Sequence, residues 1–217
     1  MSFATAANVF AQNRVLRNTF FLLALSFITT IAGTIGGIMA GLPAWGSENP
    51  VTFAVISLVG AIGLIFLTHA FRDDALGVPL FLAFSLFEGG AICGLINQVW
   101  TNPGGPMIIA NAFAGTALVT VGCSIYAMVT KRDFSVFGGF LFGSLLALLG
   151  LMVLALVFGF YGTWISYLAI PLFSFYLIWD VQRVVDGGED NYISAAIGIY
   201  LDVLNIFLHM LNIGKDD

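Results

Sequence analysis

The chain has 217 residues, of which 59% are hydrophobic and only 9% are charged. A soluble domain carries roughly 25% charged residues, so this composition, with a mean hydropathy of +1.00, indicates an integral membrane protein. Seven Lys and Arg residues against twelve Asp and Glu residues give a net charge of −5, which argues against a nucleic-acid-binding surface. The few charged residues inside apolar segments therefore matter individually.

Seven apolar segments are long enough to cross a membrane as helices. About 20 helical residues span the roughly 30 Å of a bilayer core, and the candidate spans are residues 19–42, 51–71, 78–99, 107–130, 134–160, 163–185 and 192–213. The connections are short and rich in Gly, Pro, Asn and Asp, which are typical of turns. We therefore predict an all-α membrane protein, a seven-transmembrane-helix bundle that forms a single domain over residues 1–217.

The distribution of basic residues predicts the orientation of this bundle. Cytoplasmic connections carry an excess of Lys and Arg, and in a seven-span topology only Lys215 falls on the side opposite to Arg14, Arg17, Arg72, Lys131, Arg132 and Arg183. The N-terminus is predicted to be cytoplasmic and the C-terminus outside. A reporter fused after Asp217 should therefore lie outside, and one inserted between Thr130 and Phe134 inside. Two cytoplasmic reporters would contradict the seven spans.

Small residues indicate where helices pack closely. Glycines recur at four-residue spacing, which lets helix backbones approach each other, and these positions are Gly33, Gly37, Gly41, Gly90, Gly94, Gly139 and Gly143. We interpret this pattern as packing within a monomer, with dimerisation as the alternative. Cys93 and Cys123 both lie in apolar segments with no metal-ligand spacing, and we interpret them as packing residues.

The last segment carries a polar stripe on one helix face. Its members alternate spacings of four and three residues, which places them on one side of a helix: Asn191, Ala195, Gly198, Asp202, Asn205, His209 and Asn212. The other faces are rich in Ile, Leu and Val. We expect this stripe to face protein or water, and we expect His209 to serve in packing or to reach the membrane surface.

Three acidic residues lie inside predicted spans, namely Glu88, Asp180 and Asp202. A buried carboxylate costs several kcal/mol unless it is neutralised, paired or hydrated. We expect no Lys or Arg within a span to pair with them, so the expected basic partner is Arg72, which could reach inward from the end of the second span. Glu88 is expected to face the interior and to line the outer half of a cation path.

Two carboxyl groups that share a site titrate as a unit, because ionisation of one opposes ionisation of the other. Asp180 and Asp202 could form such a proton-sharing pair. In a simple hairpin, Asp180 lies about five residues before the turn and Asp202 about eleven residues after it, an offset of about 9 Å. We expect helix tilt, or an uneven turn at Gly187 and Gly188, to close this offset.

Several motifs resemble a known family. They are WDVQ at residues 179–182, DGGEDNYISAA at 186–196 and IYLDVLNIFLHML at 199–211, with FEGG at 87–90. This pattern resembles the C-terminal signature of the transmembrane Bax inhibitor motif family, in its bacterial branch. The resemblance implies a protein of the bacterial inner membrane in which helix seven is central and is surrounded by helices one to six.

The resemblance also implies a pH-sensitive calcium leak channel. By motif position, Asp180 and Asp202 are its proton-sharing pair and its weak calcium ligands, and Arg72 pairs with the aspartate of helix six when the pore changes state. Asp73 and Asp74 are competing partners for Arg72. Calcium takes six to eight oxygen ligands, and the two aspartates, even with Asn205 of the ion path and Glu88, supply too few for tight binding.

Other functional classes lack their chemistry in this sequence. A retinal protein needs a Lys inside a helix, and Lys131 and Lys215 lie in a connection and near the terminus. The HExxH and GxSG motifs of intramembrane proteases are absent. We therefore expect no enzyme and no cofactor other than calcium as a transported or weakly bound ion. Two hypotheses remain, a calcium leak channel and a non-conducting regulator that binds other membrane proteins, such as a membrane-anchored protease.

Overall fold

A computed structural model describes the backbone of residues 3–159 and 162–216, and the side chains of residues 13–155, 158–159 and 162–215. All regular structure in these ranges is helical. The elements are α1 Phe3–Met39, α2 Leu42–Glu48, α3 Pro50–Ala70, α4 Gly77–Thr101, α5 Gly105–Val129, the short 3-10 turn η1 Ser135–Phe137, α6 Gly138–Phe158, α7 Trp164–Val185 and α8 Tyr192–Asp216. Within the described residues, seven helices are long and apolar enough to cross a membrane. The predicted fold class is therefore confirmed.

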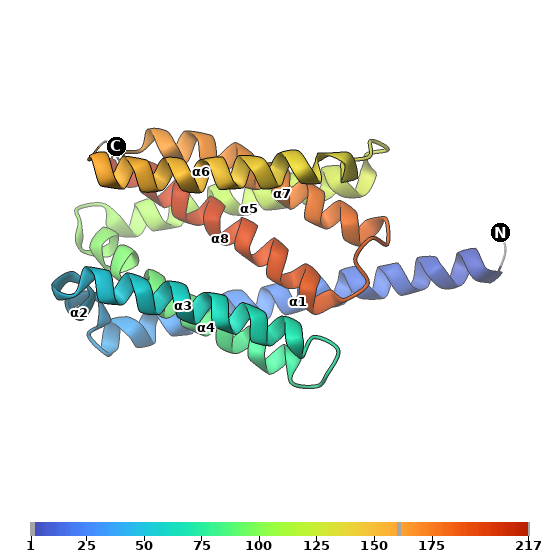
Figure 1. Cartoon of the computed structure of the whole chain (residues 1–217), viewed down its shortest axis with the longest axis horizontal. Coiled ribbons are helices and arrows are strands. Elements are labelled where there is room, and N and C mark those ends of the chain that lie inside the picture. The colour runs from blue at the N-terminus through green and yellow to red at the C-terminus, as the bar shows by residue number, and fades with distance from the viewer. Residues whose placement is uncertain (1–2, 160–161, 217) are drawn as a thin grey trace. The chain divides into compact units, whose positions relative to one another are not determined.

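The helices form two compact units (Figure 1). The first unit comprises Met1–Gly105 with Asp190–Ile197, and the second comprises Pro106–Glu189 with Gly198–Asp217. Helix α8 starts in the first unit and continues in the second. The single domain and the central position of the last helix stay predictions.

The predicted span boundaries agree with the observed helices to within three residues at most ends, and two differences have clear causes. Helix α1 begins at Phe3 rather than near residue 19 because no Gly or Pro interrupts residues 3–18. Helix α2 occupies a stretch that we expected to be a loop. It starts after Gly41, whose positive φ of 77° ends the preceding helix, and its Trp45 ring packs against Phe53 of α3. The predicted end of the fifth span, residue 160, lies outside the described residues.

In the first unit, α4 packs against α1, α2 and α3. Its closest approach is to α1, where Gly33 lies against the backbone of Leu86 and Gly89 lies against the backbone of Thr30 and Thr34. The Thr34 hydroxyl donates a hydrogen bond across this interface to the Gly89 carbonyl oxygen, at 3.1 Å. Small residues and hydroxyl groups therefore hold the two helices together, as is common between membrane helices.

The predicted glycine contacts are only partly correct. Gly33 lies in the close α1–α4 contact, and a side chain on Gly37 would meet the Cys93 sulfur at 3.0 Å. A Cβ atom on Gly90 would make only an ordinary contact with Leu42, at 3.9 Å. A side chain would meet nothing within 4 Å at Gly41, Gly94, Gly139 and Gly143. Regular spacing alone did not distinguish glycines in helix contacts from glycines that face open space.

Replacing Gly33 by alanine should destabilise the α1–α4 contact. The new methyl group would collide with the Leu86 carbonyl group, and backbone cannot move aside as a flexible side chain can. Overpacking of this kind costs about 1–3 kcal/mol, so the thermal unfolding temperature in detergent should fall. Gly36→Ala is the matched control, because a side chain there meets nothing within 4 Å. Equal unfolding temperatures for the two variants would contradict the close helix contact.

Candidate functional site

The candidate site is a pair of carboxyl groups in the second unit. Asp180 on α7 and Asp202 on α8 lie within hydrogen-bonding distance of each other. An ionised carboxylate can only accept hydrogen bonds, so a hydrogen bond between two carboxyl groups requires a proton on one of them. Asp202 is only 5% exposed, which leaves it little stabilisation by bulk water. Two carboxyl groups this close, one of them shielded from water, favour a shared proton over two negative charges.

A glycine on α8 makes room for this contact. Gly198 lies directly against the Asp180 carboxyl group, and a Cβ atom at this position would overlap Oδ2 of Asp180. Asp202 lies one helical turn further along α8, and helix side chains lean toward the N-terminus of their own helix, so its carboxyl group points back toward Asp180. Side-chain direction therefore contributes to closing the offset that we expected from residue counting. Gly187 ends α7 with a positive φ of 76°.

Asp180 also has a basic partner on its own helix, contrary to our expectation that no Lys or Arg within a span would pair with it. Nη1 of Arg183 lies 3.8 Å from Oδ1 of Asp180, three residues earlier on the same helix. The Arg183 guanidinium group also lies over the Trp179 ring, 4.7 Å from its centre, and 3.4 Å from Oε2 of Glu189. Asp202 has no such cation, and its Oδ2 atom is buried without a hydrogen-bond partner among the described residues. This asymmetry favours an ionised Asp180 and a protonated Asp202.

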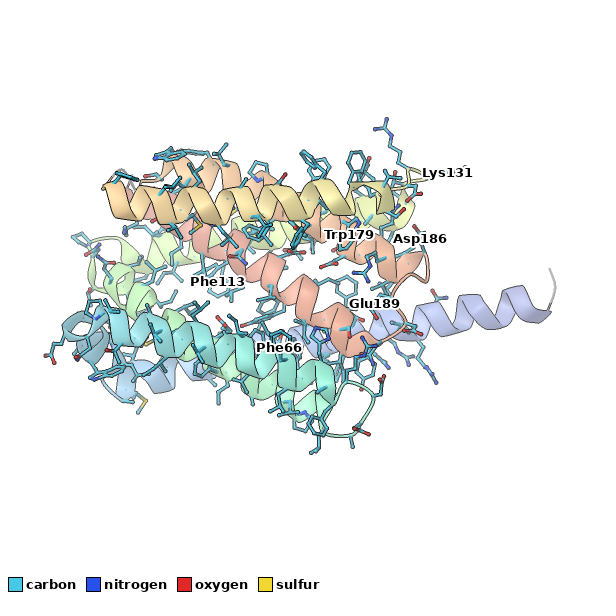
Figure 2. The ribbon with its side chains drawn as sticks, viewed as in Figure 1. Phe66, Phe113, Lys131, Trp179, Asp186 and Glu189 are labelled. Carbon is cyan, nitrogen blue, oxygen red and sulfur yellow. The ribbon has the colours of Figure 1, made fainter. Side chains whose placement is uncertain are left out.

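The other residues of the WDVQ motif secure the same end of α7, where Figure 2 shows Trp179 and Asp186 with Glu189 just beyond them. The buried amide group of Gln182 accepts a hydrogen bond from the Phe134 backbone N–H at 2.8 Å and donates one to the Arg132 carbonyl oxygen at 2.6 Å. It thereby ties the α5–α6 connection to α7. In that connection, hydrogen bonds from the Ser135 hydroxyl group and backbone N–H hold the pKa of Asp133 below its ordinary value.

The polar stripe of α8 makes a second contact with α7. Ser166 Oγ lies 3.0 Å from His209 Nδ1 and accepts a hydrogen bond from Asn212 at 3.1 Å. Ser166 keeps its own proton while it accepts from Asn212, and it can donate that proton to Nδ1 of a neutral histidine. His209 is buried rather than reaching the membrane surface. Pro171 lies within α7 between this contact and Asp180; it lacks a backbone N–H and so weakens the helix locally.

Arg72 belongs to the first unit and has partners there. Its Nε atom lies 3.7 Å from Oδ2 of Asp73, which the sequence indicated as a competing partner for Arg72. Its Nη1 atom donates a hydrogen bond to Ser194 Oγ at 3.3 Å. Asn191 caps the start of α8 through Oδ1, which accepts hydrogen bonds from two backbone N–H groups, while its Nδ2 donates to the Arg72 carbonyl oxygen at 3.1 Å. The pairing of Arg72 with Asp180 stays a prediction.

The two residues predicted for the ion path lie on different helices. Glu88 is half-buried near the middle of α4, in the first unit, and no hydrogen bond or ion pair joins it to the described residues. Asn205 lies on the α8 stripe, and its Nδ2 donates to the Leu201 carbonyl oxygen of its own helix at 2.7 Å. Its Oδ1 atom makes no hydrogen bond to the part of the chain that is described. Their roles in conduction stay predictions.

Sequence reasoning placed Gly198 on the polar stripe without predicting its contact with Asp180, and it missed Arg183, Gln182 and Ser166 as parts of this site. A signal was available for two of them. Arg183 follows Asp180 by three residues, the spacing of neighbours on a helix surface, and Gly198 precedes Asp202 by four residues on the same face. Gln182 and Ser166 contact residues that are 50 and 43 positions away in the sequence, which no local pattern could have indicated.

A family model described as "Inhibitor of apoptosis-promoting Bax1" matches residues 12–215. The chain belongs to the Bax inhibitor family. The match covers both units and every residue of the carboxyl site, so the resemblance inferred from the WDVQ and IYLDVLNIFLHML motifs is confirmed.

Bacterial members of the Bax inhibitor family match over nearly the whole chain. An uncharacterised membrane protein of Vibrio cholerae is 34% identical over 208 residues, covering 93% of this chain and 88% of the relative. The protein named "Modulator of FtsH protease YccA" of Escherichia coli strain K12 is 32% identical over 208 residues, covering 95% and 91%. Its counterpart in strain CFT073, at the same identity and coverage, is named an inner membrane protein.

Proposed function

We propose that this protein is a calcium leak channel of the bacterial inner membrane, controlled by the proton that Asp180 and Asp202 share. The observation that carries the proposal is the approach of the two carboxyl groups to within hydrogen-bonding distance, with Asp202 only 5% exposed. Family membership and the seven candidate spans support a membrane protein of this kind. The protein would have no enzymatic activity and would work as a monomer.

The shared proton can control the distance between α7 and α8. With the proton in place, the carboxyl groups are hydrogen-bonded and the helices are held together. Without it, two negative charges face each other, and at 4 Å their repulsion is on the order of 4 kcal/mol for an effective dielectric constant of about 20. Arg183 neutralises part of this repulsion, since it lies 3.8 Å from Asp180. Raising the pH should therefore favour separation of the helices, and hence flux.

Calcium would be bound only weakly on this path. The described residues include no group of three or more His, Cys, Asp or Glu side chains arranged to hold a metal ion. Two carboxylates supply fewer than the six to eight oxygen atoms that calcium takes, so the remaining ligands would be water and backbone carbonyl groups. A weakly held, largely hydrated ion suits a leak path. At high pH, calcium could also bridge the two carboxylates.

The experiment that tests conduction uses the purified chain in liposomes. Calcium entry would be followed with an enclosed fluorescent indicator, and protein-free liposomes and liposomes with heat-unfolded protein would serve as controls. The proposal requires flux above both controls that increases with pH. Flux equal to the controls at every pH would rule out the channel.

A regulator of a membrane protease is the second candidate function. It is favoured by a specific observation, the name of the Escherichia coli relative as a modulator of FtsH protease. If this chain has that role, adding it to FtsH in a shared bilayer should change the rate at which a membrane substrate is degraded. A change in degradation combined with zero calcium flux would select this second function.

Glu88→Gln should reduce calcium flux without unfolding the protein. Glu88 is a half-buried acidic residue near the middle of α4 that has no partner among the described residues, so no basic side chain competes with a cation for its carboxyl group. Glutamine keeps the shape and removes the charge. Flux at the wild-type level in a variant of unchanged unfolding temperature would assign Glu88 a packing role instead. Glu48→Gln, at the exposed end of α2, is the control for loss of one acidic charge.

A further inference from the structure

Two hydroxyl groups on α5 are unusual among those inside the helices. Most hydroxyl groups donate to a carbonyl oxygen one turn earlier in their own helix, as Thr30, Thr34, Thr68, Thr116 and Ser174 do. Thr120 Oγ1 and Ser124 Oγ are buried and have no hydrogen-bond partner among the described residues. The second unit also contains a third buried oxygen without a partner, Oδ2 of Asp202.

Contacts between α5 and α8 place these oxygens at similar depths. Near one end Gly214 packs beside Ile108, and further along Thr116 lies 3.9 Å from the Met210 sulfur. The rings of Phe113, which Figure 2 labels, and Phe207 lie 4.6 Å apart. Between the Ile108–Gly214 and Thr116–Met210 contacts, residue numbers rise along α5 and fall along α8, so the two helices are antiparallel. Continuing this register, Thr120 and Ser124 lie within about one turn, roughly 6 Å, of the depth of Asp202.

Thr120 and Ser124 also lie on the inward face of α5. They follow Thr116 at four-residue intervals, the spacing of one helix face, and Thr116 and Ser124 are each 5% exposed. Val121, one residue after Thr120, is instead 57% exposed on the outer side. The hydroxyl groups are therefore enclosed by protein at the level of the carboxyl pair.

Buried hydroxyl and carboxyl oxygens without partners cost free energy in an apolar interior. Ordered water relieves this cost where two to four polar groups surround it. We propose that Thr120, Ser124 and Asp202 line an internal water-binding site. The ligand is water, and the site gives Oδ2 of Asp202 the partner that the described protein groups do not supply.

This site would also give the buried carboxyl group a route for its proton. Asp202 can lose a proton only to a group that it contacts. Water bound by the Thr120 and Ser124 hydroxyl groups can accept this proton and transfer it to further water. This consequence rests on the proposed function, in which the proton leaves as the pH rises. Tyr176 and Asp180 interact electrostatically with Asp202 from α7, and Arg183 pairs with Asp180. Other titratable residues on the neighbouring helices include Tyr200 and His209 on α8 itself and Cys123 and Tyr126 on α5, whereas α6 carries no charged or titratable residue.

Deuterium exchange of a thiol group tests whether water reaches the site. In a background with Cys93→Ala and Cys123→Ala, Ser124→Cys would report through its S–H stretching band after transfer into D₂O. We expect this band to decay at least about tenfold faster than that of Val121→Cys, which faces lipid. Thr120→Cys is the second reporter, in case Ser124→Cys does not fold. Decay as slow as that of Val121→Cys in the folded reporters would overturn the proposal.

A second measurement separates this proposal from the proposed function. Thr120→Val with Ser124→Ala removes both hydroxyl groups with little change in shape, and should slow the response of flux to a pH jump while leaving its steady-state pH profile in place. Thr116→Val is the control, because that hydroxyl group already has partners in the Ala112 carbonyl oxygen and the Met210 sulfur. Fast thiol exchange with no flux even in the wild type would support the water site and refute the channel. Slow thiol exchange together with pH-dependent flux would support the channel and refute the water site.

Discussion

Replacing Asp202 by asparagine is expected to abolish the pH dependence of calcium flux. In the wild type we expect calcium flux in liposomes to rise on the order of tenfold from about pH 6 to about pH 8. This is a typical strength for coupling between a binding event, here loss of the proton, and a second site. Asparagine can still donate a hydrogen bond to Asp180 but cannot ionise. The two helices should therefore stay together at every pH, with flux held at the low-pH level of the wild type.

The partner substitution and a control make this prediction specific. Asp180→Asn should have the same effect, and the double variant should add little, since residues in direct contact act as one unit. Asp186→Asn removes an exposed acidic residue just beyond the end of α7 and should leave the pH profile unchanged. If neither Asp202→Asn nor Asp180→Asn changed the pH profile, the two aspartates would not be the pH sensor, and the non-conducting regulator would be favoured.

Gly198→Ala is expected to have the opposite effect on flux. The added methyl group would overlap Oδ2 of Asp180, so the two carboxyl groups could not keep their hydrogen bond. Flux at about pH 6 should rise toward the wild-type level at about pH 8, and overpacking should lower the free energy of unfolding by about 1–3 kcal/mol. Calcium flux and thermal unfolding would be measured on the same preparation.

Gly122→Ala is the matched control for this substitution. It lies in α5, in the same unit, and a side chain there meets nothing within 4 Å. Both flux and unfolding temperature should stay at wild-type values in this control. If Gly198→Ala also retained low flux at low pH, the contact between Asp180 and Asp202 would not be what holds the path closed.

Sequence periodicity predicted the helices well because each span must satisfy its own backbone hydrogen bonds in lipid. An apolar run of about 20 residues therefore has few alternatives to helix. The short helix α2 was missed because its seven residues include Pro43, Gly46 and Ser47, which are typical of turns. The start of α1 was missed because a helix can continue beyond the membrane wherever no residue breaks it.

The candidate site was only partly predictable. The face shared by Gly198, Asp202, His209 and Asn212 follows from helix geometry, and each of these residues contacts α7. The meeting of Asp180 and Asp202 was predicted, but counting residues gives only the depth of Cα atoms and leaves out the direction of the side chains, which also brings the two groups together. The roles of Gln182 and Ser166 depend on contacts between distant segments, which a single sequence does not encode in any short pattern.

The presence of a proton between Asp180 and Asp202 can be measured directly by infrared spectroscopy. A protonated carboxyl group has a C=O stretching band that is separate from the bands of ionised carboxylates. The shared proton predicts a component of this band in the wild type at low pH that disappears as the pH rises and that Asp202→Asn lacks. Glu88→Gln should retain it. A spectrum with no protonated-carboxyl band that depends on Asp202 would contradict the shared proton and the control mechanism built on it.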